Sequence, residues 1–173
     1  MRVVAGRFKG RTLHAPKGRA TRPTSDKVRE AIFSVLGDVE GTTVLDLFAG
    51  SGALGIEALS RGAVHAVFVE NDEQALASLR RNLAELDVGA EVQRRDALAF
   101  LRAARHEFDL VFVDPPYSSA PRLGERLSAL LPAVLSNDAR IVTEQDKRYP
   151  LELELPLEFE RDYGETRIRI HRA

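Results

Sequence analysis

The chain contains no cysteine and no tryptophan, and it has only one methionine. Without cysteine there is no disulfide framework, no thiolate metal site and no cysteine nucleophile. No apolar run approaches the roughly 20 residues that a membrane-spanning helix requires, and residues 1–7 lack the long apolar stretch of a signal peptide. These absences predict a cytoplasmic protein.

What is present predicts one globular domain with a short appendage. The 173 residues are 44% hydrophobic and 29% charged, which is the mixture of a folded protein. The charge is uneven, because residues 1–29 carry nine lysines and arginines against one acid, Asp26, for a net charge of +8, and the other residues carry −9. A basic segment on an acidic body favours contact with a polyanion, although a solvated basic tail has the same composition.

Glycines and prolines divide the chain into expected elements. Residues 2–6 and 7–13 are expected to form short strands around a glycine turn, followed by a loop over residues 15–23. Thr24 or Ser25 is expected to cap a helix that Gly37 ends. From residue 43, strands are expected at 43–48, 63–70, 91–95, 108–114 and 140–144, and helices at 53–61, 72–86, 97–104 and 122–135.

The alternation of strands and helices predicts an α/β fold with a doubly wound, mostly parallel sheet. Continuous apolar runs, such as residues 110–113, suit strands that are covered on both faces. The end of the chain differs, because residues 151–159 and 166–172 are joined by a short turn with no helix between them. These two segments are expected to form an antiparallel hairpin that closes the sheet.

A glycine-rich turn follows the first strand of this sheet. Gly50, Gly52 and Gly55 satisfy G-x-G-x-x-G directly after a strand and before a helix. Such glycines let the backbone approach a ligand, and the N–H groups of the helix start face a polar or anionic group. Glu70 ends the second strand, where a carboxylate can accept hydrogen bonds from both hydroxyls of a ribose. The turn and the acid together do not separate a nicotinamide cofactor from S-adenosylmethionine.

Asp46 favours the second of these cofactors. It lies inside an apolar strand, where a carboxylate needs partners. The ammonium and sulfonium groups of S-adenosylmethionine would supply them, whereas a diphosphate cofactor gains nothing from an acid at this place. Asp96, just after the third strand, is placed to accept from an adenine amino group.

The sequence Asp114-Pro115-Pro116-Tyr117 ends the fourth strand. Ligands of doubly wound sheets bind outside these strand ends, and two prolines fix the backbone and remove two N–H donors. The Asp114 carboxylate and the Pro115 carbonyl can together receive both hydrogens of an exocyclic amine, and Tyr117 offers a flat face on which a base can stack. The motif therefore predicts a site that binds an amino group on a base.

Together these motifs resemble class I S-adenosylmethionine-dependent methyltransferases of the D/N-P-P-Y/F group. More closely, the chain resembles the bacterial 16S rRNA guanine-N2 methyltransferases, the RsmD family. The matching segments are residues 2–6 with Gly10 and Arg11, residues 22–30, residues 46–61 and residues 112–117. No motif departs from the family pattern, and residues 118–173 carry little that is specific.

The resemblance implies a seven-stranded Rossmann-like methyltransferase domain over residues 22–173. A small basic β-hairpin and arm, residues 1–21, would precede it and bind RNA through Arg2, Arg7, Lys9, Arg11, Lys17 and Arg19. S-adenosylmethionine would be held by Arg22, Thr24, Ser25, Asp46, Phe48, Gly50, Gly52, Glu70, Asn71, Asp96, Ala97 and Asp114. Catalysis would belong to Asp114, Pro115, Pro116 and Tyr117.

The leading interpretation is transfer of a methyl group to the N2 amine of a guanine in 16S rRNA within a small-subunit particle. A monomer suffices, and no metal is expected because the sulfonium already activates the methyl group. A DNA or other RNA adenine or cytosine amino-methyltransferase would use the same motif, although the chain has no obvious large target-recognition domain. A non-catalytic nucleic-acid-binding or assembly protein on this fold is a further alternative, and a nicotinamide oxidoreductase is a more distant one.

Overall fold

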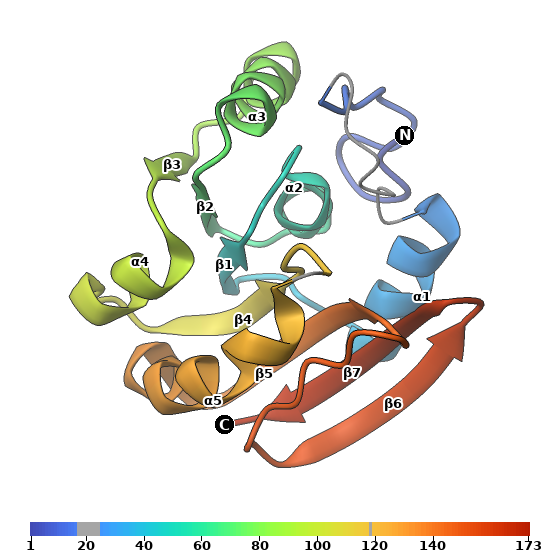
Figure 1. The fold of residues 1–173 in the computed structure, drawn as a ribbon. Helices are drawn as coiled ribbons and strands as arrows, with labels where there is room; N and C mark the ends of the chain where they lie inside the picture. The colour runs from blue at the N-terminus through green and yellow to red at the C-terminus, as the bar shows by residue number, and fades with distance from the viewer. Residues whose placement is uncertain (17–24, 118) are drawn as a thin grey trace.

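The computed structural model describes residues 1–16, 25–117 and 119–173, and its centre is one seven-stranded sheet (Figure 1). The strands are β1 (Thr43–Leu47), β2 (His65–Glu70), β3 (Glu91–Arg94), β4 (Phe108–Val113), β5 (Leu135–Asp146), β6 (Leu157–Tyr163) and β7 (Thr166–Arg172). Their order across the sheet is β3-β2-β1-β4-β5-β7-β6. Strands β1 to β5 pair in parallel, and β7 pairs antiparallel with both β5 and β6. The predicted doubly wound sheet with a C-terminal hairpin is therefore confirmed.

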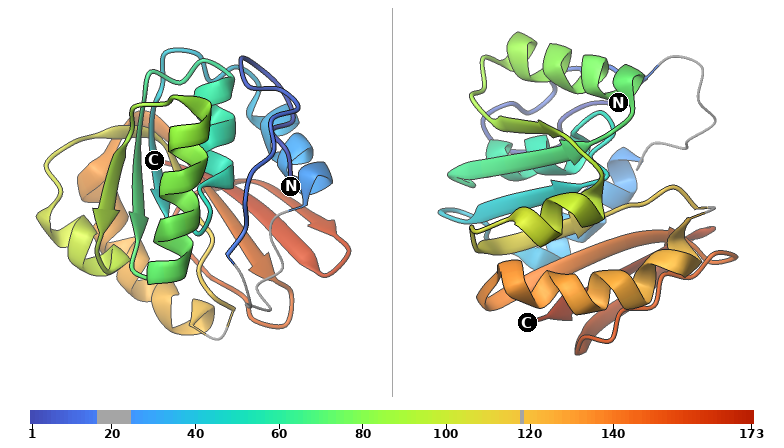
Figure 2. Two further views of the ribbon diagram at one scale, coloured as in Figure 1. Left: turned by 90° about the horizontal axis from the view of Figure 1, so that it is seen from above. Right: turned by 60° about the vertical axis from the view of Figure 1, so that its left-hand side comes forward.

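Helices cover both faces of the sheet (Figure 2). They are α1 (Asp26–Leu36), α2 (Ala53–Ser60), α3 (Glu73–Leu86), α4 (Ala97–Ala103) and α5 (Ala120–Leu130), followed by the 3₁₀ helix η1 (Leu131–Val134). The first three share one hydrophobic cluster with the N-terminal segment, and α4 and α5 belong to a second cluster on the opposite face. Within the described residues, no helix combines the length and the apolar character needed to cross a bilayer.

The first helix begins and ends as its sequence predicts. The Ser25 hydroxyl accepts from the Val28 N–H at 3.2 Å. Ser25 is therefore the N-cap of α1, because it satisfies a backbone N–H of the first turn that has no partner within the helix. At the other end Gly37 has φ 71°, a conformation that favours glycine, and its N–H donates to the Phe33 carbonyl. Thr24, the other expected cap, lies outside the described residues.

The last third of the chain departs most from the expected bounds. Helix α5 ends at Leu130 rather than at residue 135, because Pro132 cannot donate a helical hydrogen bond. Strand β5 begins at Leu135 rather than at 140, across a shift in its register with β4. Residues 151–155 are not a strand. They lie between two prolines and place Leu151 and Leu153 in the core instead, so β6 begins at Leu157.

The N-terminal hairpin is present in a reduced form. Arg2 and Thr12 form an isolated antiparallel bridge, and the Val3 N–H donates to the Arg11 carbonyl at 3.0 Å. The expected strand over residues 7–13 is wrong at its start, because residues 7–10 form the turn between two glycines with positive φ, Gly6 and Gly10. This segment lies beside α1 and α2 (Figure 1).

The described N-terminal residues are packed into the domain. Val3, Phe8 and Leu13 are at most 7% exposed and belong to the same cluster as α1 to α3. The buried carboxylate of Glu57, on α2, accepts the backbone N–H groups of Val4 and Ala5 at 2.8 and 3.0 Å. Residues 1–16 are therefore anchored to α2 by both apolar and polar contacts.

Candidate active site

The loop between β1 and α2 forms the centre of the carboxyl edge of the sheet. Phe48, Gly50 and Gly52 have φ of 59°, 58° and 80°, so the chain turns sharply away from the strand. A Cβ on Gly52 would lie 2.3 Å from Leu79, and one on Gly55 would lie 2.4 Å from Phe68. These two glycines are required by packing. Gly50 differs, because a Cβ there would meet nothing nearer than 3.9 Å, so its backbone faces open space.

Glu70 organises this loop from the neighbouring strand. Its Oε2 accepts the Gly50 N–H at 2.8 Å, and its Oε1 accepts the N–H groups of Asn71 and Asp72 at 2.7 and 2.8 Å. A carboxylate offers about four lone-pair sites, so acceptor capacity remains on Oε2. Glu70 thus fixes the glycine loop and can still bind a hydroxyl.

Asp46 is a carboxyl group buried within β1. It is 2% exposed, and its Oδ2 accepts the Gly55 N–H at 2.9 Å. Burial raises the pKa of Asp46 to about 8; the Gly55 hydrogen bond opposes this rise, and the charge of Glu70 adds to it. A cationic ligand beside Asp46 would stabilise the ionised form, so the site suits an ammonium or sulfonium group.

The D-P-P-Y motif begins where β4 ends. Asp114 is partly buried, Pro115 is buried, and the Pro116 carbonyl accepts both the N–H and the hydroxyl of Ser119 at 2.9 and 2.8 Å. The motif is therefore a fixed turn. Burial, together with the charges of Glu144 and Asp46, raises the pKa of Asp114 well above its usual range.

Strand register explains why these acids meet. Asp46 pairs with Phe112 of β4, and Phe112 pairs with Val142 of β5. Side chains two residues apart on a strand point to the same face. Asp114 lies two residues after Phe112, and Glu144 lies two residues after Val142. The three carboxyl groups therefore share one face of the sheet, the face that α1 covers.

Glu144 is a candidate site residue that the sequence interpretation did not include. It is 3% exposed and lines a cavity of about 270 Å³ together with Ser25, Lys27, Val28, Tyr163, Gly164 and Thr166. The signal that singled out Asp46, a carboxylate inside an apolar strand, also applies to residues 141–144. Only the register between β4 and β5 places Glu144 beside Asp114.

The remaining predicted cofactor residues are spread along the same edge. Asp96 and Ala97 follow β3, two strands from β1, and the Asp96 side chain caps α4 by accepting the Ala99 N–H at 2.9 Å. Asn71 is exposed directly after β2. Ser25 lies apart from them, in the cavity with Glu144. Arg22 and Thr24 lie outside the described residues. Cofactor binding by each of these residues stays a prediction.

The predicted RNA-binding cations that the structure describes all reach the surface. Arg2, Arg7, Lys9 and Arg11 are exposed, whereas Lys17 and Arg19 lie outside the described residues. Arg29 also contributes to the positive charge of residues 1–29, but it is fully buried. It pairs with Asp26 at 2.9 Å and with Glu57 at 3.7 Å. Arg29 is therefore part of the fold rather than a free cation.

Replacing Asp46 by asparagine is expected to stabilise the cofactor-free protein, and more so at higher pH. Between pH 4 and 8 the unfolded chain has an ionised Asp46 while the folded chain holds its proton. The contribution of the Asp46 carboxyl to the free energy of unfolding is therefore complete below the pKa that this group has in the unfolded chain. It is lost as the pH rises toward 8, the pKa in the folded chain. Urea unfolding should show the advantage of the variant growing by about 2–4 kcal/mol from pH 5 to pH 8. An advantage that is equal at both pH values would contradict the assignment.

Comparisons with known proteins identify relatives of the chain. Residues 1–172 match the family described as Conserved hypothetical protein 95. A Bacillus subtilis (strain 168) protein named as an rRNA methyltransferase, YlbH, is 45% identical over 167 residues, which cover 90% of this chain and 86% of the relative. Ribosomal RNA small subunit methyltransferase D of Escherichia coli (strain K12) is 44% identical over 119 residues, 68% of this chain and 60% of the relative.

A solved structure described as a methyltransferase, yhhF, from Escherichia coli has 36% identity and a TM-score of 0.86, over 99% of this chain and 97% of that chain. A match over nearly the whole sequence and the same fold lead to one conclusion. The chain belongs to the RsmD family of methyltransferases.

Proposed function

We propose that the protein transfers a methyl group from S-adenosylmethionine to the N2 amine of a guanine in small-subunit ribosomal RNA. The observation that carries this proposal is the position of Asp114. It begins a rigid D-P-P-Y turn and lies on the same face of the sheet as Asp46, at the edge where the glycine loop turns. The names of the relatives favour ribosomal RNA as the substrate.

The residues present fit the cofactor in its chemistry. Asp46 is a desolvated acid that a cation would stabilise, and Glu70 keeps acceptor capacity for a ribose hydroxyl. The open space at Gly50 lets a ligand approach the backbone between them. When bound, the cofactor supplies a methyl group already activated by a positive sulfur.

The chain's own residues would activate and orient the amine. An exocyclic amine delocalises its lone pair into the ring, which makes it a poor nucleophile. Asp114 and the Pro115 carbonyl would accept its two hydrogens, favour a tetrahedral nitrogen and aim the lone pair at the methyl carbon. Positioning of this kind supplies several kcal/mol of the barrier. In its ionised form Asp114 also stabilises the positive charge that develops on nitrogen, and the nitrogen then loses one proton to Asp114 or to water.

A methylation assay tests the proposal. Small-subunit particles assembled on 16S rRNA transcribed without modifications would be incubated with the protein and S-adenosylmethionine, beside naked rRNA and duplex DNA. Mass spectrometry of the digested nucleosides should find N2-methylguanosine in rRNA, and mass spectrometry of oligonucleotide fragments should place it at one position. Methyladenosine or methylcytosine in DNA, with no methylguanosine in rRNA, would overturn the proposal in favour of a DNA amino-methyltransferase.

Substituting the exposed N-terminal cations is expected to weaken RNA binding without unfolding the protein. The variant changes Arg2, Arg7, Lys9 and Arg11 to glutamine, and these side chains are exposed. If each contacts one phosphate, the slope of log affinity against log salt shrinks by about 3 in magnitude. The control changes four exposed arginines of or near α4 and α5 to glutamine: Arg102, Arg105, Arg122 and Arg126. Equal salt slopes for the two variants would contradict RNA contact through the N-terminal segment.

A further inference from the structure

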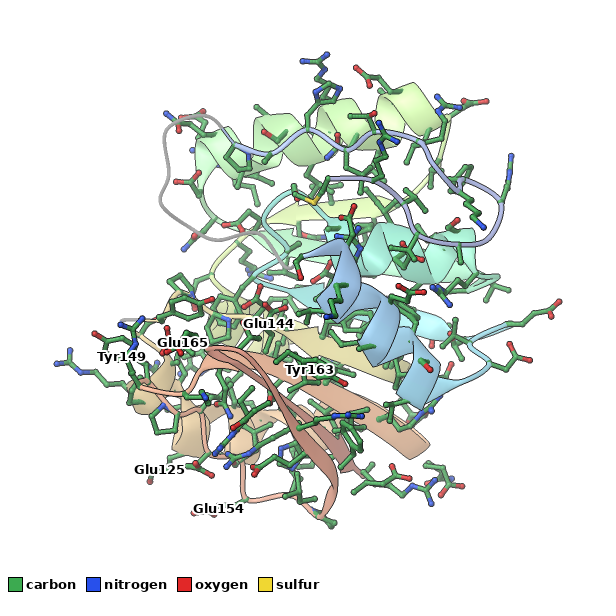
Figure 3. All side chains as sticks on the ribbon, turned by 90° about the vertical axis from the view of Figure 1, so that its right-hand side faces the viewer. Glu125, Glu144, Tyr149, Glu154, Tyr163 and Glu165 are labelled. Atoms are coloured by element: carbon green, nitrogen blue, oxygen red, sulfur yellow. The ribbon has the colours of Figure 1, made fainter. Side chains whose placement is uncertain are left out.

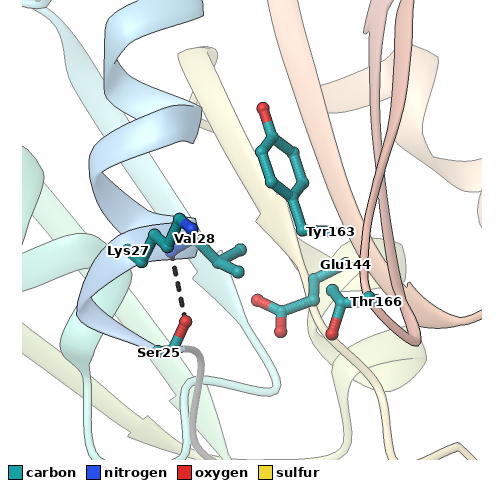
Figure 4. A pocket seen from close by; sticks show the side chains of 7 residues that line it. Ser25, Lys27, Val28, Glu144, Tyr163 and Thr166 are labelled. Atoms are coloured by element: carbon teal, nitrogen blue, oxygen red, sulfur yellow. Dashed lines mark hydrogen bonds between the residues drawn. The ribbon is translucent and has the colours of Figure 1, made fainter.

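The cavity around Glu144 is lined by groups from three parts of the chain. The lining residues from the start of α1 are Ser25, Lys27 and Val28, and Glu144 comes from β5. The β6–β7 hairpin contributes the end of β6, the turn and the start of β7 through Tyr163, Gly164 and Thr166. Figure 4 shows the Glu144 carboxylate directed into the space between these elements. In Figure 3, Glu144 and Tyr163 lie in the half of the sheet that ends with the C-terminal hairpin, β6 and β7. Glu144 follows Thr143, which pairs with Val113 at the end of β4, so the cavity begins one strand away from the D-P-P-Y turn.

Glu144 is a fixed neighbour of Asp114. Val113 and Thr143 are partners in the parallel ladder, so the residues that follow them lie on adjacent chains, roughly 5 Å apart along the hydrogen-bonding direction. Both side chains point to the face covered by α1. The charge of Glu144 also contributes to the raised pKa of Asp114, which agrees with this proximity. A base whose amine reaches Asp114 would thus place the neighbouring atom of its edge toward Glu144.

Bases that carry an amine differ at that neighbouring atom. In guanine, the N2 amine is beside N1–H, which is a second hydrogen-bond donor. In adenine the N6 amine is beside the N1 lone pair, and in cytosine the N4 amine is beside the N3 lone pair. Two adjacent acceptors therefore match guanine alone among these three. A carboxylate facing a lone pair is repelled, and sites built to hydrogen-bond one partner reject an analogue without it strongly.

We propose that Glu144 selects guanine by accepting its N1–H while Asp114 accepts the N2 amine. This inference rests on the proposed function and adds the residue that separates guanine from adenine and cytosine, which the D-P-P-Y motif does not separate. The same cavity offers donors for the guanine O6 acceptor, because Ser25, Lys27 and Thr166 line it. Tyr163 borders the cavity from the hairpin turn (Figure 4). Glu144 is a specificity residue of the site, and the transfer itself still depends on Asp114.

The test replaces Glu144 by glutamine and the target guanine by 2-aminopurine. This base keeps the amine but has a lone pair at N1, and glutamine keeps the shape of glutamate while its amide can donate to that lone pair. The assay uses small-subunit particles whose 16S rRNA carries guanine or 2-aminopurine at the position found by nucleoside mapping, joined by ligation. 2-Aminopurine also lacks O6, but this loss is common to both proteins and cancels when their preferences are compared.

Wild-type protein should prefer guanine, and E144Q should reduce the ratio of kcat/KM for guanine to that for 2-aminopurine by about tenfold to hundredfold, as expected for a hydrogen bond to a charged group. The matched control is E165Q, because Glu165 is exposed and next to the cavity in sequence but does not line it. E165Q should keep the wild-type preference. Calorimetry with S-adenosylmethionine and circular dichroism would establish that E144Q is folded.

Three results would overturn the inference. One is wild-type protein that methylates both bases equally, which needs no variant to interpret. The second is folded E144Q with the wild-type preference, and the third is E165Q that loses the preference as E144Q does. If wild-type protein transfers no methyl to guanine-containing particles, the proposed function itself fails. Transfer without discrimination rejects only the role of Glu144.

Discussion

Replacing Asp114 by alanine is expected to abolish methyl transfer while leaving affinity for S-adenosylmethionine within a few-fold of wild type. The resemblance also counts Asp114 among the cofactor residues, but the Glu70 and Asp46 carboxylates accept the N–H groups of Gly50 and Gly55 without contact from Asp114 in these two hydrogen bonds. The amine, by contrast, would lose its charged acceptor. Removing one preorganised electrostatic partner from an active site costs about 100- to 1,000-fold in rate. Single-turnover methyl transfer to small-subunit particles and calorimetric binding of the cofactor would measure the two effects separately.

Asparagine at the same position is the matched control. It keeps an acceptor oxygen in the same place, and the group that the motif resembles contains either Asp or Asn there. Asp114→Asn should therefore retain more activity than Asp114→Ala. Both variants leave Glu144 and Asp46, the charged neighbours of position 114, in place. Equal loss of cofactor binding and turnover in the alanine variant would make Asp114 a structural or cofactor residue. Full activity in that variant would remove it from the mechanism.

The strands and the glycine turn could be predicted from the sequence because their signals are local. Apolar runs of five or six residues, bounded by glycines or acids, mark β1, β2 and β4 with errors of one or two residues. Strand β5 begins at Leu135 and continues with Ser136-Asn137-Asp138, which are turn-forming residues, and Asp138 has φ 62°. Its true start depends on pairing with Phe108 across a register shift, which is a tertiary effect.

Candidate site residues could be named from the sequence where one segment holds the chemistry, but not where two segments must be aligned. Asp46, Glu70 and Asp114 each follow from a motif, whereas Glu144 gains its meaning only beside Asp114. The N-terminal segment has the same difficulty. Val3, Phe8 and Leu13 are buried, but their spacing of five residues matches neither a helix nor a strand. The positive charge of residues 1–21 therefore led to the prediction of an arm, and the sequence did not predict that Val3, Phe8 and Leu13 are buried.

Replacing Glu57 by alanine is expected to destabilise the protein by about 3–5 kcal/mol, which is the usual cost of breaking a buried ion pair. The Glu57 side chain is fully buried, and its carboxylate contacts the Arg61 Nε at 2.8 Å and the Arg29 Nε at 3.7 Å. Alanine would leave the buried charge of Arg29 without this partner. It would also leave the N–H groups of Val4 and Ala5 without their acceptor. Exposed Glu30, on α1, gives the control variant Glu30→Ala.

The same contacts predict the outcome of removing the N-terminal segment. As an arm, residues 1–21 could be deleted without loss of the methyltransferase domain. The packing of residues 1–16 favours the opposite result, because deletion would expose the cluster around Val3 and Phe8 and remove two hydrogen bonds from Glu57.

Both Glu57→Ala and the deletion should lower Tm by about 10 °C, at roughly 2–4 °C per kcal/mol for a chain of this size. Glu57→Gln, which keeps an acceptor oxygen, should fall between Glu57→Ala and wild type. A Tm within 2 °C of wild type for either Glu57→Ala or the deletion would show that residues 1–21 are an independent arm. RNA binding could then be tested by deleting this arm instead of by substituting its charges.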